Sequence, residues 1–257
     1  MGNPLLENLR SNDKNKLFVP TQTSVSYKTG FMPYDYRNGY NIEVRDSNDK
    51  LVKTYPSLGL VGGSFTTIIG KTGTAKTTFA AQISANIVKH FPSGFVIHYD
   101  LEQALNYTRL RNVTKLTTRQ LIDHYVLKQE MSYIEDIFKA IKEICASKES
   151  NRKEYTYETG LVNEFNEPII MYVPTFIIID SIPTLASREL AKDEMEGQTQ
   201  KMRMVGIITS WYATLTPIIK AYNINIITIN HIKQKIDINP FAKTQPQLMY
   251  LKVDELI

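Results

Sequence analysis

The stretch Gly70-Lys71-Thr72-Gly73-Thr74-Ala75-Lys76-Thr77-Thr78 predicts the fold of the chain around it. It follows the short run 65–69, whose apolar and β-branched residues are typical of a buried parallel strand. Apolar residues at helical spacing come directly after it: Phe79, Ile83, Ile87 and Phe91. A glycine-containing loop between a strand and a helix is the setting of a phosphate-binding loop, so the stretch predicts a nucleotide site.

Phosphate binding assigns a role to each part of this loop. Successive backbone N–H groups curl around a phosphate, and the following helix adds the positive end of its dipole. We expect the Lys76 ammonium to reach the β- and γ-phosphates, and the Thr77 hydroxyl to ligate Mg²⁺. The whole stretch is therefore a candidate site for ATP and Mg²⁺, although Lys71 reads more simply as a solvated lysine.

Ala75 departs from the usual form of such a loop, which has a second glycine before the lysine. Its Cβ adds bulk where the backbone often requires little, although alanine is the least obstructive replacement. Two interpretations stay open: a loop that still binds nucleotide, or a decayed loop in a structural paralogue. The intact Lys76 and Thr77 favour the first.

Three further apolar runs predict strands, at 95–99, 176–179 and 224–229. Helical patterns alternate with them, which favours an α/β domain with a mainly parallel twisted sheet flanked by helices. Between the second and third runs, residues 148–174 predict an inserted β-hairpin.

Two local signals concern helices. Ser132 and Glu135 have the spacing of a capping box and predict the start of an apolar-periodic helix. Pro217 lies inside a second helical region, about residues 200–222, and predicts a kink or break there.

Polar residues end three of the predicted strands, where chemistry gathers in a parallel α/β sheet. The second strand runs into Asp100-Leu101-Glu102-Gln103-Ala104-Leu105, and Glu102 is a candidate to orient or deprotonate an attacking water. On position alone, a surface or helix-capping glutamate is equally consistent. Asp180 ends the third strand and is a candidate Mg²⁺ ligand, while Asn230 and His231 end the fourth and could sense a γ-phosphate.

Composition sets broader limits. The 257 residues are 42% apolar and 22% charged, enough for one large domain, which we divide into an arm at 1–28 and a core at 29–257. Cys145 is the single cysteine, so a disulfide framework is excluded and a cytoplasmic setting is expected. No run is long enough to predict a membrane span, and the net charge of +4 is too mild to argue for a polyanion partner.

Taken in order, these segments resemble the RecA-like recombinases, most closely their phage branch of UvsX type. The resemblance covers roughly residues 29–235 and includes the entry and strand-end segments as well as the phosphate loop. Its further motifs are Thr29-Gly30, Asp35, Gly39, Gly59 to Gly63, Asp100 to Leu105, Asp180-Ser181, Leu185 to Arg188, Thr216-Pro217, Asn223-Ile224 and Ile229 to His231.

The resemblance implies an ATP-dependent strand-exchange protein that forms a filament on single-stranded DNA. It implies Glu102 as the catalytic carboxylate, Tyr107 as a candidate adenine-stacking ring, and two DNA-contacting loops, near 192–203 and from 233 to about 252. Candidate DNA contacts in these loops are Lys201, Arg203, Lys233, Lys235, Phe241 and Lys243. Without the resemblance, solvated loops with scattered lysines are the simpler interpretation. If the protein is phage-encoded, the bacterial host cytoplasm is its expected location.

The family continues beyond the second loop with a glycine pair and further strands, whereas this sequence stops at Ile257. The resemblance therefore implies a fragment or short form of a longer protein, and hydrolysis by this chain alone is an open question. Two alternatives remain: a replicative DNA helicase on the same core, or a paralogue that binds DNA or a partner without hydrolysing ATP.

Overall fold

The computed structural model describes residues 25–45, 48–162, 168–192, 198–234 and 248–249. Most of the predicted arm at 1–28 lies outside these ranges. Its last residues do not form an arm: β1 (Ser26–Tyr27) pairs with β4 (Leu60–Val61), and Tyr27 is buried. The core therefore begins earlier than the sequence predicted, because burial of the Tyr27 ring ties this segment to it.

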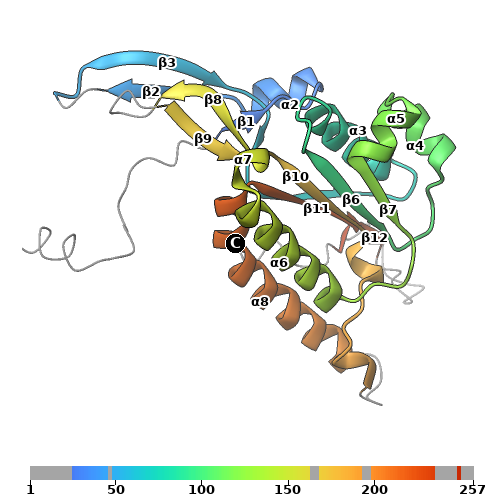
Figure 1. Cartoon of the computed structure of the whole chain (residues 1–257). Helices are drawn as coiled ribbons and strands as arrows, with labels where there is room; N and C mark the ends of the chain where they lie inside the picture. Colours follow the sequence, from blue (N-terminus) through green and yellow to red (C-terminus); the bar gives the residue numbers. More distant parts are fainter. Residues whose placement is uncertain (1–24, 46–47, 163–167, 193–197, 235–247, 250–257) are drawn as a thin grey trace, which may run out of the picture.

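A sheet of five parallel strands forms the centre of the described chain (Figure 1). Its order is β5 (Phe65–Gly70), β11 (Ile224–His231), β10 (Thr175–Asp180), β6 (Phe95–Asp100) and β7 (Tyr125–Lys128). Four of these strands match the predicted runs, and β7 is an additional edge strand. Every residue of β10 is buried, as expected for a central parallel strand covered on both faces.

Helices cover both faces of this sheet. α3 (Lys76–Val88), α4 (Tyr107–Thr114) and α5 (Thr118–His124) pack on the face that carries Ile178 and Ile227. On the other face, α6 (Ile134–Ser150) and α8 (Gln198–Tyr222) pack over Ile177 and Ile226 (Figure 1). Neighbouring residues of one strand thus serve opposite layers, which confirms the predicted α/β class.

Pro217 does not break α8, which runs from Gln198 to Tyr222. A proline removes one backbone donor and its helical hydrogen bond. Trp211, Leu215 and Ile219 are buried against the sheet on either side of it, so tertiary packing holds the helix through the proline.

The capping box predicted at Ser132 and Glu135 is wrong by one residue. α6 has Tyr133 as its N-cap, and the Asp136 carboxylate accepts a hydrogen bond from the Tyr133 N–H at 3.1 Å. Glu135 is used elsewhere: it accepts from the Ser187 hydroxyl at 2.6 Å. The spacing of Ser132 and Glu135 fits a capping box, but Glu135 makes a tertiary hydrogen bond to Ser187 instead.

The turn-rich segment before β5 contains ordered structure. α2 (Met32–Arg37) is followed by a hairpin of β2 (Tyr40–Arg45) and β3 (Leu51–Ser57). Buried Asp35 accepts from the Thr29 N–H at 2.9 Å and the Thr29 hydroxyl at 2.7 Å. Gly59 has a positive φ of 95°, and a Cβ there would lie 2.2 Å from the Tyr27 carbonyl oxygen. The entry motif is therefore a structural turn.

The predicted inserted hairpin is present as antiparallel β8 (Thr156–Val162) and β9 (Pro168–Tyr172), preceded by α7 (Arg152–Tyr155). Short 3-10 turns, η1 (Ile182–Thr184) and η2 (Leu190–Lys192), link β10 to α8, and a small ladder joins β12 (Lys233–Gln234) to β13 (Leu248–Met249). Among the described residues, no helix is long and apolar enough to span a membrane.

Candidate functional site

The predicted phosphate loop lies between β5 and α3, at the carboxyl end of the sheet. Residues 71–75 are exposed, whereas Lys76, the first residue of α3, is only 7% exposed. The Lys71 carbonyl accepts from both the Thr74 hydroxyl and the Lys76 ammonium, each at 2.8 Å. Both hydrogen bonds lie within the loop, and they hold the Lys76 ammonium beside the exposed residues 71–75.

Ala75 occupies the position where the usual loop has glycine, and its backbone conformation is one that glycine adopts readily. Its φ of 61° and ψ of 25° place it in the left-handed region, where it is the N-cap of α3. For a residue with a Cβ, this conformation costs roughly 1–2 kcal/mol. The chain nevertheless adopts the glycine-type conformation with alanine.

Thr77 and Asp180 join the loop to the centre of the sheet. The Thr77 hydroxyl, in the first turn of α3, donates a hydrogen bond to Asp180 Oδ2 at the end of β10. Asp180 is buried, and burial raises its pKa above the ordinary value; Glu102 and Asp100 add to this, while the Thr77 hydrogen bond opposes it. The two residues predicted to hold Mg²⁺ are therefore in direct contact.

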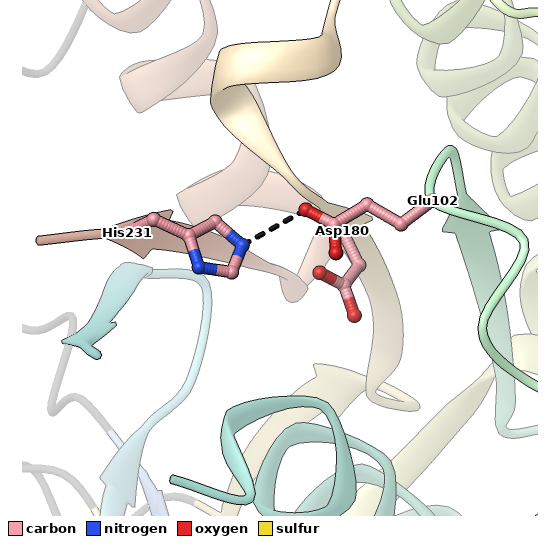
Figure 2. A group of neighbouring side chains, drawn as sticks. All are labelled: Glu102, Asp180 and His231. Carbon is pink, nitrogen blue, oxygen red and sulfur yellow. Dashed lines mark hydrogen bonds and ion pairs between the residues drawn. The ribbon is translucent and has the colours of Figure 1, made fainter. Parts of the chain in front are cut away.

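Glu102 reaches the same place from the turn after β6. Its Oε1 accepts from the Ser181 hydroxyl at 2.6 Å and from His231 Nε2 at 2.8 Å. Figure 2 shows Glu102 and His231 facing each other, with Asp180 beside Glu102. One carboxylate oxygen thus links the carboxyl ends of three neighbouring strands: β6, β10 and β11.

Buried Asp100 builds the turn that carries Glu102. Its carboxylate accepts from the N–H groups of Ala104 at 3.1 Å and Leu105 at 2.8 Å. The Gln129 side chain donates to the same carboxylate at 2.8 Å and to the Leu105 carbonyl at 2.6 Å. Asp100 is consequently a structural residue of the site, and no sequence signal pointed to Gln129 as its partner.

His98 lies behind Asp180 and is fully buried. Its Nε2 is 4.0 Å from Asp180 Oδ2, and its Nδ1 is 2.8 Å from the Tyr125 hydroxyl. Burial lowers the pKa of His98 to about 4, against the opposing charge of Asp100. The imidazole is therefore neutral near pH 7, and its approach to Asp180 is not an ion pair.

The donors around Asp180 suit a hard divalent cation. Ligand atoms of Glu102, Asp180 and His231 lie within 4.8 Å of one another. Asp180 Oδ1 is buried and has no hydrogen-bond partner among the described residues. Mg²⁺ prefers oxygen ligands, so the Thr77 hydroxyl and the Asp180 carboxylate fit it better than the His231 nitrogen, which is bonded to Glu102.

The remaining predicted site residues are placed as follows. Asn230 is buried, and its Oδ1 accepts from the His231 N–H at 2.8 Å, so its amide oxygen shapes the strand end locally. Tyr107 is exposed at the first residue of α4. Its contact with adenine stays a prediction.

The predicted DNA-contacting loops are only partly described. Residues 198–203 of the first loop, with Lys201 and Arg203, are helical, because they form the first turns of α8. Lys233 is in β12, while Lys235, Phe241 and Lys243 lie outside the described residues. Their contact with DNA stays a prediction.

A clamp that the sequence did not reveal holds the segment after Asp180. Glu135 accepts from the Ser187 hydroxyl at 2.6 Å and from the Arg188 N–H at 3.1 Å, and the Arg188 guanidinium donates to Asp136 at 2.7 Å. The Ile134 N–H donates to the Ala186 carbonyl at 2.9 Å. The chain leaving the site is thereby fixed to the N-terminus of α6.

A scan against protein-family models and a search of the curated proteins give no match for this chain.

Proposed function

We propose that this chain is an ATP-binding domain that uses Mg²⁺ and hydrolyses ATP, acting as a recombinase that holds single-stranded DNA for strand exchange. One observation carries the nucleotide part: the Thr77 hydroxyl bonds to Asp180, which joins the phosphate-loop candidate to the acidic strand end. The DNA part rests on the order and spacing of the motifs that resemble the RecA-like recombinases.

Lys76 is the expected contact to the β- and γ-phosphates. An ammonium has three donors, and the Lys71 carbonyl takes one of those of Lys76. The exposed backbone of residues 71–75 and the N-terminus of α3 would surround the remaining phosphate oxygens. Bound Mg²⁺ would neutralise charge that develops on the phosphates, with Thr77 and Asp180 as its protein ligands.

Glu102 is the candidate general base. In the structure, its Oε1 is held by Ser181 and His231, both from neighbouring strand ends. Both bonds are made by Oε1, so a rotation that brings this oxygen toward a water near the γ-phosphate would loosen the bond to Ser181 or the bond to His231. His231 lies at the end of β11, so loosening of its bond gives a direct route from nucleotide state to the segment that follows.

Titration with a fluorescent ATP analogue and Mg²⁺ tests the nucleotide part. Lys76→Ala removes charge-assisted hydrogen bonds, each worth about 1.5–3 kcal/mol, so we expect affinity to fall roughly 10- to 150-fold. Lys89→Ala, an exposed lysine just after the same helix, is the matched control and should bind like the unmodified chain. Absence of Mg²⁺–ATP binding by the unmodified chain would contradict the proposal.

Two further assays separate the alternatives. Strand exchange between a single strand and a homologous duplex supports a recombinase, whereas unwinding of a forked duplex supports a helicase. A third case is a loop that binds nucleotide without turnover. ATP binding with no phosphate release, in the presence or absence of single-stranded DNA, would identify that case.

A further inference from the structure

His98 is the one buried histidine of β6, and the proposed mechanism gives it no task. It shares a face of the sheet with Asp100, Ile178 and Asp180, because His98 pairs with Ile178 and Asp100 with Asp180 in the parallel register. Its ring is therefore directed to the same layer as the Asp180 carboxylate, beneath the first turn of α3.

His98 Nε2 and Asp180 Oδ1, two buried polar atoms on this side of the sheet, each lack a hydrogen-bond partner among the described residues. A buried polar atom that stays unpaired costs roughly 1–3 kcal/mol, so an unpaired imidazole nitrogen and an unpaired oxygen of the neighbouring carboxylate call for an explanation. Nε2 lies 4.0 Å from Asp180 Oδ2, one small side-chain rotation beyond hydrogen-bonding distance.

Tyr125 determines which ring nitrogen of His98 carries the proton. Its hydroxyl lies 2.8 Å from Nδ1, and burial raises the pKa of Tyr125 well above the ordinary value, so the phenol keeps its proton. If the phenol donates to Nδ1, the single proton of the neutral imidazole resides on Nε2, where it faces the carboxylate. The opposite tautomer would turn a lone pair toward a carboxylate oxygen and is disfavoured.

We propose that His98, oriented by Tyr125, is a positioning residue for Asp180: its Nε2–H donates to the carboxylate once Asp180 ligates Mg²⁺. The carboxylate would then be held from three elements, by Thr77 of α3, His98 of β6 and its own strand β10. Partners of this kind orient a ligating group, and their loss costs 10- to 100-fold in metal affinity in roughly comparable sites. The inference rests on the proposed Mg²⁺–ATP site.

The test measures the Mg²⁺ concentration that gives half-maximal binding of a fluorescent ATP analogue to the full chain. His98→Phe keeps the ring volume but removes both nitrogens. We expect the half-saturating Mg²⁺ concentration to rise about 10- to 100-fold, with nucleotide binding in EDTA unchanged. A purely structural histidine would change both measurements together, or neither.

His98→Gln tests for rescue, because its side-chain amide restores an N–H donor, and it should lie between His98→Phe and the unmodified chain. Tyr125→Phe keeps His98 but frees its tautomer, and should raise the half-saturating Mg²⁺ concentration less than His98→Phe does. His124→Phe is the matched control: this buried histidine bonds to the Gly94 carbonyl at 2.7 Å and has no contact with Asp180.

The outcomes separate the two proposals. If the unmodified chain does not bind Mg²⁺–ATP, the proposed function fails. If it binds, and His98→Phe leaves the Mg²⁺ requirement unchanged, only the role of His98 is overturned. Should His98→Phe fail to fold, His98→Gln and Tyr125→Phe decide: a Mg²⁺ requirement unchanged in both overturns the role, and a raised one supports it.

Discussion

Two buried lysines lie at opposite ends of the parallel sheet, and their surroundings differ. Lys76, at the carboxyl end, makes one hydrogen bond within the described part of the chain, to a carbonyl in its own exposed loop. Lys148, near the end of α6, donates to the Val173 and Tyr222 carbonyls, each at 2.8 Å, just before β10 and β11 begin. Burial lowers the pKa of Lys148 to about 7.

The difference separates the proposed phosphate-binding cation from a structural one. Lys76 keeps donors next to an open loop, so it can change partners when a ligand arrives. Lys148 ties three segments together, and both of its partners are backbone carbonyls. Burial alone therefore does not distinguish the two lysines; the accessibility of their remaining donors does.

The largest effect is expected for Lys148→Ala. It removes a long buried side chain and its hydrogen bonds to two carbonyls, so we expect the free energy of unfolding to fall by about 3–5 kcal/mol. Denaturant unfolding measures this. Lys76→Ala, measured in the same way, should change stability far less, and equal losses in the two variants would contradict the distinction between them.

A smaller effect concerns pH. Because the pKa of Lys148 is about 7 in the folded chain and ordinarily 10.5, the unfolded chain binds an extra proton between these pH values. Stability should therefore rise with pH in this window, by at most about 1.4 kcal/mol per unit from this group, and the penalty is fully present below it. Unfolding of Lys148→Met across the same window should lack this slope. A slope that persists in the variant would assign it to other groups.

The smallest effect is expected at the loop itself. Ala75→Gly relieves the left-handed conformation, so the free energy of unfolding should rise by about 1 kcal/mol. Ala85→Gly, inside α3, is the opposite control and should lower stability, because that backbone is helical. Thermal unfolding of both variants compares the two signs. A loss of stability in Ala75→Gly would show that the conformation carries no strain.

The sequence predicted the fold where apolar runs were long and bounded. β5, β6, β10 and β11 all fall on predicted runs. It did not predict β7, whose four residues Tyr125–Lys128 are too few to show a period. The β2–β3 hairpin lies in a segment rich in turn residues, where no strand pattern is evident. Glu135 bonds to Ser187 across the fold, so the local spacing of a capping box did not predict its partner.

The candidate site could be predicted only in outline. The ends of parallel strands meet at one edge, so the convergence of Glu102, Asp180 and His231 followed from their positions. Ser181 belongs to the Asp180-Ser181 motif, to which the sequence assigns no role for the serine. His98 has the sequence context of any residue in a buried strand. Their importance depends on side-chain geometry across strands that are distant in sequence, which no local pattern records.

The two ends of the segment that forms the β8–β9 hairpin lie side by side, because the Val173 N–H donates to the Tyr155 carbonyl at 2.7 Å. A segment with adjoining ends resembles a removable module: closing the gap with a short turn needs little rearrangement of its neighbours. The hairpin touches the core through Tyr157, which bonds to Tyr27 and packs on Phe91 at 4.8 Å between ring centres. A change in its length or composition therefore leaves the candidate site at the carboxyl end of the sheet untouched.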